Sequence, residues 1–312
     1  MDTTAQMVKE SSVCIVVDTS VFNVNRAVSR GDVLVTAAEN GEAKSATINQ
    51  KRVSVGKKLI DSPELRVIWA HDAATRDWLR FRSVPSEIIR SGAYLVSVEA
   101  LPAVYEYLEA RAQEREALVQ KFAVAYVEQV RAAKKELGPL WRADQYPSAE
   151  GIVAAFGFSW RVIEVGTPDA KLRTVSRAMF EKEREKAEKV WSNSVGLINE
   201  ALAEGLAEVI NHLAEKLGGG DEPPKRLHAS AVEQVTAFLD VFDSRNLTRN
   251  ADLAALAEKA RGLLSGVDAK LLKTDKDTRV AVAAGFAAVR AGLDVMLENR
   301  PARAVTFVDE EV

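Results

Sequence analysis

The sequence is poor in the residues that build disulfides and zinc sites. It contains one cysteine, Cys14, and three histidines in 312 residues. A single cysteine excludes a disulfide within the chain. A structural zinc site needs four cysteine or histidine ligands, and His71, His212 and His228 share no ligand spacing. We therefore predict a protein without a metal centre or another cofactor.

The sequence also lacks a long apolar run and a strong charge of one sign. No run reaches the roughly 20 residues that a membrane-spanning helix needs. The polar N-terminus, with Asp2 and Glu10, does not have the pattern of a signal peptide. The 42 basic and 45 acidic side chains leave a net charge of -3, which gives no overall attraction to nucleic acid or to anionic membranes. These features predict a cytoplasmic protein that does not bind membranes.

Hydrophobic residues make up 47% of the chain, which is enough for a packed core. Near the N-terminus, β-branched residues gather at 13–17, 33–35 and 47–55. These runs predict two or three short strands, and Cys14 within the first run is predicted to be a small core residue. So few strands cannot form a core alone, and they must pack on helices. We therefore predict a small α+β region over residues 1–95.

The clearest helical pattern covers residues 98–137. Its apolar residues recur at spacings of three and four, with Arg115 as the one polar member of the stripe. Pro102 falls in the first turn, where proline is tolerated, and Gly138-Pro139 ends the pattern. This predicts one helix of about 37 to 40 residues, about 55 to 60 Å long.

A second pattern predicts a helix over residues 170–217, about 70 Å long if it is unbroken. Within it, residues 181–189 contain a single apolar residue, Ala187, so this stretch is predicted to be solvated. The two long helices are similar in length, which favours antiparallel pairing with a coiled-coil-like seam. We therefore predict a long helical hairpin over residues 96–217.

The segment that joins the two helices is rich in large aromatic residues. Their clustering predicts a small packed tip for the hairpin at residues 139–168, with a strand or hairpin over residues 158–165. These aromatic residues are Trp141, Tyr146, Phe156, Phe158 and Trp160.

Glycine and proline over residues 218–227 predict a linker. Three shorter helical patterns follow and predict a three-helix unit over residues 228–300, and residues 301–312 are predicted to be a tail. The predicted fold class is therefore mainly α. It comprises a long antiparallel helical hairpin, a small N-terminal α+β region and a C-terminal helical unit.

Asp18 lies at the end of a predicted strand, in the run Val-Val-Asp-Thr-Ser over residues 16–20. This run resembles the opening of PIN-type nucleases and the start of a von Willebrand-type metal site, where such a carboxylate binds magnesium or manganese. A nuclease of this type needs a helix directly after the motif, but the poor helix formers Asn23, Asn25, Ser29 and Gly31 follow it. A structural strand with an Asx-type turn is favoured, and a metal-dependent nuclease at Asp18 is an alternative.

Basic residues cluster near Trp78 and Phe81. Basic groups interleaved with aromatic residues can bind single-stranded nucleic acid, but acidic residues such as Asp77 are interspersed with them. Association with nucleic acid is therefore an alternative that the sequence does not favour. The candidate contacts are Arg76, Arg80, Arg82 and Arg90.

Several short motifs follow one another in a characteristic order within residues 12–217. They are Val-Ser-Val-Gly-Lys-Lys-Leu-Ile-Asp at 53–61, Trp78-Leu79, Val84-Pro85-Ser86, Phe122 and Tyr126 within the first long helix, and Trp141. Together they resemble the domain of unknown function 3150 family of phages and bacteria. This chain has Val-Gly-Lys where that family often has Leu-Gly-Ser, and it lacks a Gly-Thr-Arg-Phe run near Phe81.

The resemblance implies an accessory protein of a bacterial or phage-infected cytoplasm. Members of that family are encoded near MoxR-like AAA+ ATPases, which implies an adaptor or assembly role beside such an ATPase. The resemblance supplies no catalytic residues. The chain itself has no nucleotide-binding motif.

The leading hypothesis from the sequence is a non-enzymatic scaffold or adaptor that forms homo-oligomers. A hairpin about 60 Å long has little core per residue and gains from lateral partners. The predicted interaction surface combines the aromatic tip with the apolar stripe of the second helix, represented by Leu206 and Leu213.

Overall fold

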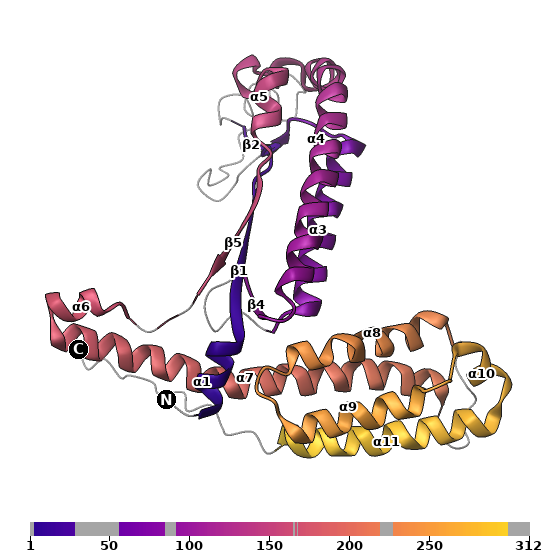
Figure 1. Ribbon diagram of the computed structural model, residues 1–312. Helices are drawn as coiled ribbons and strands as arrows, with labels where there is room; N and C mark the ends of the chain where they lie inside the picture. Colours follow the sequence, from indigo (N-terminus) through magenta and orange to yellow (C-terminus); the bar gives the residue numbers. More distant parts are fainter. Residues whose placement is uncertain are drawn as a thin grey trace, which may run out of the picture. The chain divides into compact units, whose positions relative to one another are not determined.

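The computed structural model describes residues 3–28, 56–84, 92–164, 166, 168–218 and 227–298. Helices make up 73% of the structure and strands 10%, which confirms the predicted mainly α class (Figure 1). The predicted small α+β region at the N-terminus is also confirmed. Its elements are α1 (Thr3–Ser11), β1 (Ser12–Thr19), β2 (Asn25–Ala27), β3 (Gly56–Lys58), α3 (Pro63–Arg82) and β4 (Ala93–Ser97).

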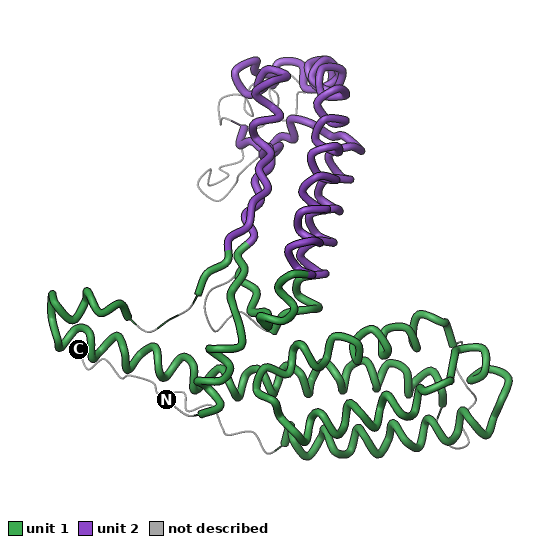
Figure 2. Tube along the Cα trace, in the orientation of Figure 1, with its two compact units in different colours: residues 1–16, 79–102, 162–312 green, residues 17–78, 103–161 purple. Residues whose placement is uncertain are grey.

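The chain forms two compact units that alternate along the sequence (Figure 2). The predicted hairpin over residues 96–217 is therefore divided between them. Unit 1 comprises Met1–Val16, Leu79–Pro102 and Val162–Val312, and unit 2 comprises Val17–Trp78 and Ala103–Arg161.

Most of the first predicted long helix lies in unit 2. It is α4 (Leu101–Leu137), a single helix of 37 residues, as its apolar pattern predicts. Gly138 follows with φ of 50°, a left-handed conformation that glycine adopts without strain, and Pro139 comes next. The segment that returns along the chain contains two short 3-10 helices, α5 (Ala149–Ala154) and β5 (Phe158–Ile163). The predicted strand after residue 158 is therefore found.

The core of unit 2 lies between α3 and α4. Ser62 precedes α3, and its hydroxyl accepts a hydrogen bond from the Leu65 backbone N–H at 3.4 Å. Buried residues of α4 pack against residues of α3, of α5 and of the chain around β2 and β3. The cluster comprises Phe22, Val24, Leu59, Ile60, Leu65, Ile68, Val119, Phe122, Tyr126 and Ile152.

In unit 1, β1 pairs with β4 in an antiparallel ladder, with Ser12 opposite Ser97 and Val16 opposite Ala93. The sheet order is β4-β1-β5. This ladder contains the first predicted strand, and Cys14 within it is buried, as predicted. The other two predicted strand segments, 33–35 and 47–55, lie outside the described residues.

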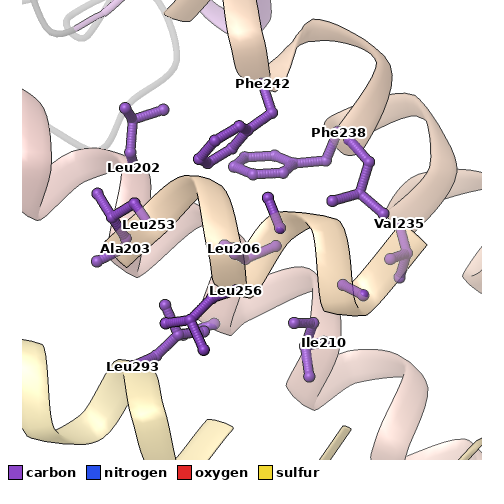
Figure 3. Close-up of a cluster of buried hydrophobic side chains, with 14 of the residues drawn as sticks. Leu202, Ala203, Leu206, Ile210, Val235, Phe238, Phe242, Leu253, Leu256 and Leu293 are labelled. Carbon is purple, nitrogen blue, oxygen red and sulfur yellow. The ribbon is translucent and has the colours of Figure 1, made fainter. Parts of the chain in front are cut away.

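The main core of unit 1 is a helical bundle. Its long helices are α7 (Arg177–Leu217), α8 (Ala229–Arg245), α9 (Ala251–Leu264) and α11 (Lys276–Glu298), with the short α10 (Ala269–Thr274) before α11. Figure 3 shows Phe238 and Phe242 of α8 beside apolar residues of the neighbouring helices. A Cβ atom at Gly205 would lie 2.8 Å from the Phe238 ring, so glycine lets α7 and α8 approach closely.

The three predicted C-terminal helices correspond to α8, α9 and α11, but they are not a separate unit, since they pack on α7. This packing covers the apolar stripe of α7 that was predicted to face α4. Pairing between α4 and α7 is therefore not found among the described residues: the buried residues of α4 belong to the unit 2 core, and those of α7 belong to the bundle. The mainly α class was predictable from the sequence, whereas the helices that cover each apolar stripe were not.

The second long helix begins later than predicted. The chain forms a short helix, α6 (Ala170–Val175), and breaks at Ser176, which is extended with φ of -158°. The Ser176 hydroxyl accepts a hydrogen bond from the Met179 backbone N–H and caps the start of α7. The predicted linker over residues 218–227 and the tail over residues 301–312 lie outside the described residues, except for Gly218 and Leu227.

The polar stretch of α7 over residues 181–189 is solvated, as predicted, because none of its residues is buried. Ion pairs one helical turn apart cover it, between Arg184 and both Glu181 and Glu188, between Lys186 and Glu183, and between Lys189 and Glu185. Such exposed pairs stabilise a helix only slightly. They neutralise most of the charges of this segment within the helix itself.

Candidate functional site

The most strongly organised polar group in unit 2 is the ion pair of Arg115 and Asp72. Arg115 is 2% exposed and Asp72 3%. The Arg115 guanidinium donates to both carboxylate oxygens of Asp72, at 2.7 and 3.1 Å, and to the backbone carbonyl of Ser20 at 2.9 Å. The rings of Phe156 and Phe158 lie within 6 Å of the guanidinium carbon. The charges are therefore matched, hydrogen-bonded and shielded from water.

Arg111, one turn earlier on α4, makes a second link to α3. Its guanidinium donates to the hydroxyl of Thr75 at 2.9 Å, to the backbone carbonyl of His71 at 2.8 Å and to the Glu114 carboxylate at 2.6 Å. The two arginines thus connect the two helices through hydrogen bonds at consecutive turns. Arg115 on an otherwise apolar stripe is the sequence signal for this network, because a buried charge requires a buried counter-charge.

His71 completes the network. Its Nδ1 lies 3.5 Å from Asp72 Oδ1 and its Nε2 lies 3.5 Å from Glu114 Oε2, and the buried Nε2 makes no hydrogen bond. Burial lowers the pKa of His71, and the positive charge of Arg111 lowers it further, against the opposite effect of the two carboxylates. The neutral imidazole is therefore favoured in the folded protein.

We expect the stability of the protein to decrease as the pH falls below about 6.5, the ordinary histidine pKa. The unfolded chain binds a proton on His71 more tightly than the folded chain, so the contribution of neutral His71 is complete above that pH and is lost below it. The measurement is the urea midpoint between pH 5 and pH 8. The slope should be smaller in His71→Gln, and an unchanged slope would contradict the assignment.

A shallow pocket of about 330 Å³ lies beside Arg115. Of the described residues that line it, none is a serine, cysteine, lysine or histidine. Its acidic group is Glu116, and the arrangement offers hydrogen-bonding groups beside two aromatic rings without a paired nucleophile and base. The lining residues are Ala112, Gln113, Arg115, Glu116, Val119, Gln120, Val153, Phe156 and Phe158.

Asp18, the residue of the nuclease alternative, is exposed on β1 and pairs with Arg161 of β5 at 2.8 Å. A two-metal or one-metal nuclease site needs several carboxylates together. Within the described ranges, no three histidine, cysteine, aspartate or glutamate residues come together in a group that could hold a metal ion. The partner that the structure assigns to Asp18 is thus an arginine.

The five aromatic residues predicted to form one tip are partly buried and spread along α4. Trp141 stacks on Tyr146 with ring centres 5.6 Å apart, next to the end of α4. Phe156 packs on Phe122 in its middle, and Trp160 packs on Tyr105 near its start. Phe158 contacts Trp160. These residues therefore hold the returning segment against α4, which is a structural role within unit 2.

Leu206 and Leu213, predicted to belong to an interaction surface, are fully buried in the bundle core. Because α8, α9 and α11 already cover this stripe of α7, a partner has no access to these two side chains in the folded protein. The prediction treated α7 as one side of a two-helix hairpin, whereas the bundle supplies it with three further helices.

The basic residues of the nucleic-acid alternative lie on α3 where they are described. Arg76 and Arg80 are exposed one turn apart, and Arg82 is partly buried with its guanidinium 5.8 Å from the Phe81 ring. Trp78, which was considered for base stacking, instead stacks on Tyr107 with ring centres 3.7 Å apart. Arg90 lies outside the described residues. Nucleic-acid binding stays a prediction.

The outer face of α11 is apolar and exposed. Val280 is 51% exposed and Val295 57%, and five alanines between them are also exposed. Among the described helices, α11 is the one whose length and composition would allow it to cross a membrane. Its opposite face is buried in the bundle through Val282, Phe286 and other residues. The exposed alanines are Ala281, Ala284, Ala287, Ala288 and Ala291.

Comparison with known proteins adds no relative: no protein-family model, no curated protein and no solved structure matches the chain. The resemblance to the domain of unknown function 3150 family therefore stays a prediction.

Proposed function

We propose that the protein is a non-enzymatic helical scaffold or adaptor that associates with further copies of itself. The observation that carries the proposal is the exposed apolar face of α11, on a bundle whose core is otherwise complete. An exposed apolar face of this kind is typical of an interaction site. We define the α11 face by the residues Val280, Ala284, Ala287, Ala288, Ala291 and Val295.

The α11 face has the symmetry that a two-fold interface requires. In an antiparallel pair of α11 helices, Val280 lies opposite Val295, Ala284 opposite Ala291, and Ala287 opposite Ala288. Such an interface is self-complementary, and the small alanine side chains permit close helix packing.

The proposal is tested by measuring the solution mass with size-exclusion chromatography and multi-angle light scattering. For the wild-type protein, we expect a multiple of the 34.0 kDa chain mass. For the variant Ala284→Lys/Ala291→Lys, we expect the mass of one chain, because the two lysines on the α11 face would be desolvated beside the two lysines of the partner. Ala237→Lys/Ala255→Lys, on exposed positions of α8 and α9, is the matched control and should keep the wild-type mass. A monomeric wild-type protein would refute the proposal.

We further propose a AAA+ ATPase as a partner, on the basis of the family resemblance. In the adaptor role, the self-associated protein binds the ATPase. A change in the ATP hydrolysis rate of a MoxR-like ATPase on addition of the chain would support this part. An unchanged rate together with no co-elution would refute it and leave the self-association proposal intact.

A further inference from the structure

The first part of α7 extends beyond the bundle. Buried residues of α7 begin at Trp191, and none of residues 177–190 is buried. Its described helical neighbour is α6, which packs against α7. We call α6 together with residues 176–190 the arm. Because the arm contributes nothing to the bundle core, its conformation is not explained by the packing of unit 1.

The end of the arm exposes large apolar side chains. Val175 is 77% exposed and Met179 is 53% exposed. These two residues lie on either side of the break at Ser176, where α6 turns into α7. Apolar side chains this accessible at one point of a protein indicate a contact site.

The same end of the arm is basic. Lys171, Arg173 and Arg177 are exposed, and in the described part of the chain no carboxylate forms an ion pair with any of them. Asp169 caps α6 by accepting from the Lys171 backbone N–H, and Glu181, one turn after Arg177, pairs with Arg184. In the neighbouring stretch 181–189, the charged residues other than Lys182 form ion pairs with one another. The end of the arm is therefore an apolar and positively charged patch, and it fits an apolar segment that carries negative charge.

The chain itself contains such a segment after α11. Val305, Phe307 and Val308 are apolar, and residues 309–311 are Asp-Glu-Glu. These apolar residues match the exposed side chains of the arm in kind. The three carboxylates are opposite in sign to Lys171, Arg173 and Arg177 of the arm, so apolar burial and charge attraction act together.

Residues 305–311 can reach the arm within the same chain. Helices α7 and α11 lie side by side in opposite directions, so that α11 ends on the side of the bundle from which the arm extends (Figure 1). With 41 residues in α7 and 23 in α11, α7 is longer by about 27 Å at 1.5 Å per residue. An extended chain spans about 3.3 Å per residue. The chain from Glu298 therefore reaches up to about 23 Å at Val305 and about 43 Å at Glu311.

We propose that residues 305–311 dock on the end of the arm of the same chain, with Phe307 and Val308 on Val175 and Met179, and the acidic residues on Lys171, Arg173 and Arg177. Docking within one chain is favoured over docking between chains because a short tether gives a high effective concentration. This contact is separate from the α11 face, so either can be disproved without the other.

Hydrogen exchange of the full chain tests the proposal. In the variant Phe307→Ser/Asp309→Asn/Glu310→Gln/Glu311→Gln, we expect the amides of residues 171–180 to exchange at least fivefold faster than in the wild type. Amides of residues 195–215, in the bundle, should not change. The matched control is Glu208→Gln/Glu215→Gln/Asp240→Asn, which removes three exposed carboxylates from α7 and α8 and should leave the arm as in the wild type.

A charge exchange gives the second readout. Arg173→Glu/Arg177→Glu should expose the arm to exchange, and the further changes Asp309→Lys/Glu310→Lys should restore its protection, which a merely destabilised helix would not show.

Three results would overturn the proposal. The first is equal exchange in the wild type and the residue 307–311 variant. The second is protection that rises with protein concentration, which would assign the tail to a second copy. The third is protection of the arm from hydrogen exchange only when vesicles containing one third phosphatidylserine are present, which would assign the patch to an anionic membrane.

Discussion

Replacing Asp72 with asparagine should lower the free energy of unfolding by about 3 to 5 kcal/mol. The substitution keeps the shape of the side chain but removes the negative charge that faces Arg115. Arg115 is 2% exposed, so water cannot take over the role of the carboxylate. The cost is that of an uncompensated buried charge, and the urea midpoint should fall accordingly.

The double variant Asp72→Leu/Arg115→Met should be more stable than Asp72→Asn, because it removes both charges together. Asp61→Asn is the control at an exposed ion pair, with Lys58 and Arg66 as partners, and it should barely change the midpoint. If Asp72→Asn behaves like Asp61→Asn, the pair is solvated and the description of the network is wrong.

Replacing Leu206 with alanine should lower the free energy of unfolding by about 2 to 5 kcal/mol. The side chain is fully buried in the bundle, beside residues of α8 and α9 (Figure 3). Its removal loses apolar burial and leaves a cavity that surrounding helices fill only in part. Glu208→Ala, at an exposed position of the same helix, is the control and should change the free energy by less than about 0.5 kcal/mol.

Charged replacements at the same stripe should have a still larger effect. Leu206→Glu/Leu213→Glu places two carboxylates in the bundle core without partners, and we expect the helical circular dichroism signal of unit 1 to be lost at 25 °C. A double variant that keeps the wild-type spectrum and melting temperature would show that α8, α9 and α11 do not cover this stripe.

Periodicity in the sequence identifies which face of a helix is buried, but it does not identify what covers that face. The stripe of α4 predicts both its length and its buried residues, such as Phe122 and Tyr126. The stripe of α7 is equally suited to one long partner or to three shorter ones. The hairpin was predicted because α4 and α7 are similar in length. In the structure, α8, α9 and α11 pack on the stripe of α7 instead.

The polar network was only half visible in the sequence. Arg115 interrupts an apolar stripe, which indicates a buried counter-ion, but nothing in the local pattern singles out Asp72 among the acidic residues of α3. The two lie far apart in the sequence and meet because α3 and α4 pack side by side. The α11 face was missed for a similar reason. An apolar residue in a helix is expected to be buried, and only the packing of the neighbouring helices shows which face of the helix stays exposed.

The alternation of the two units along the chain has a consequence for biosynthesis. Every segment of unit 2 has been translated once Arg161 is added, so this unit can fold while the ribosome is still at work. Unit 1 includes α1, which precedes unit 2 in the sequence, but Ala5 and Val8 of α1 belong to a core whose other members lie mostly in α7 to α11. Helix α1 must therefore remain without its main helical partner until α7 has been made. An N-terminal fragment released early would expose these residues to chaperones and proteases.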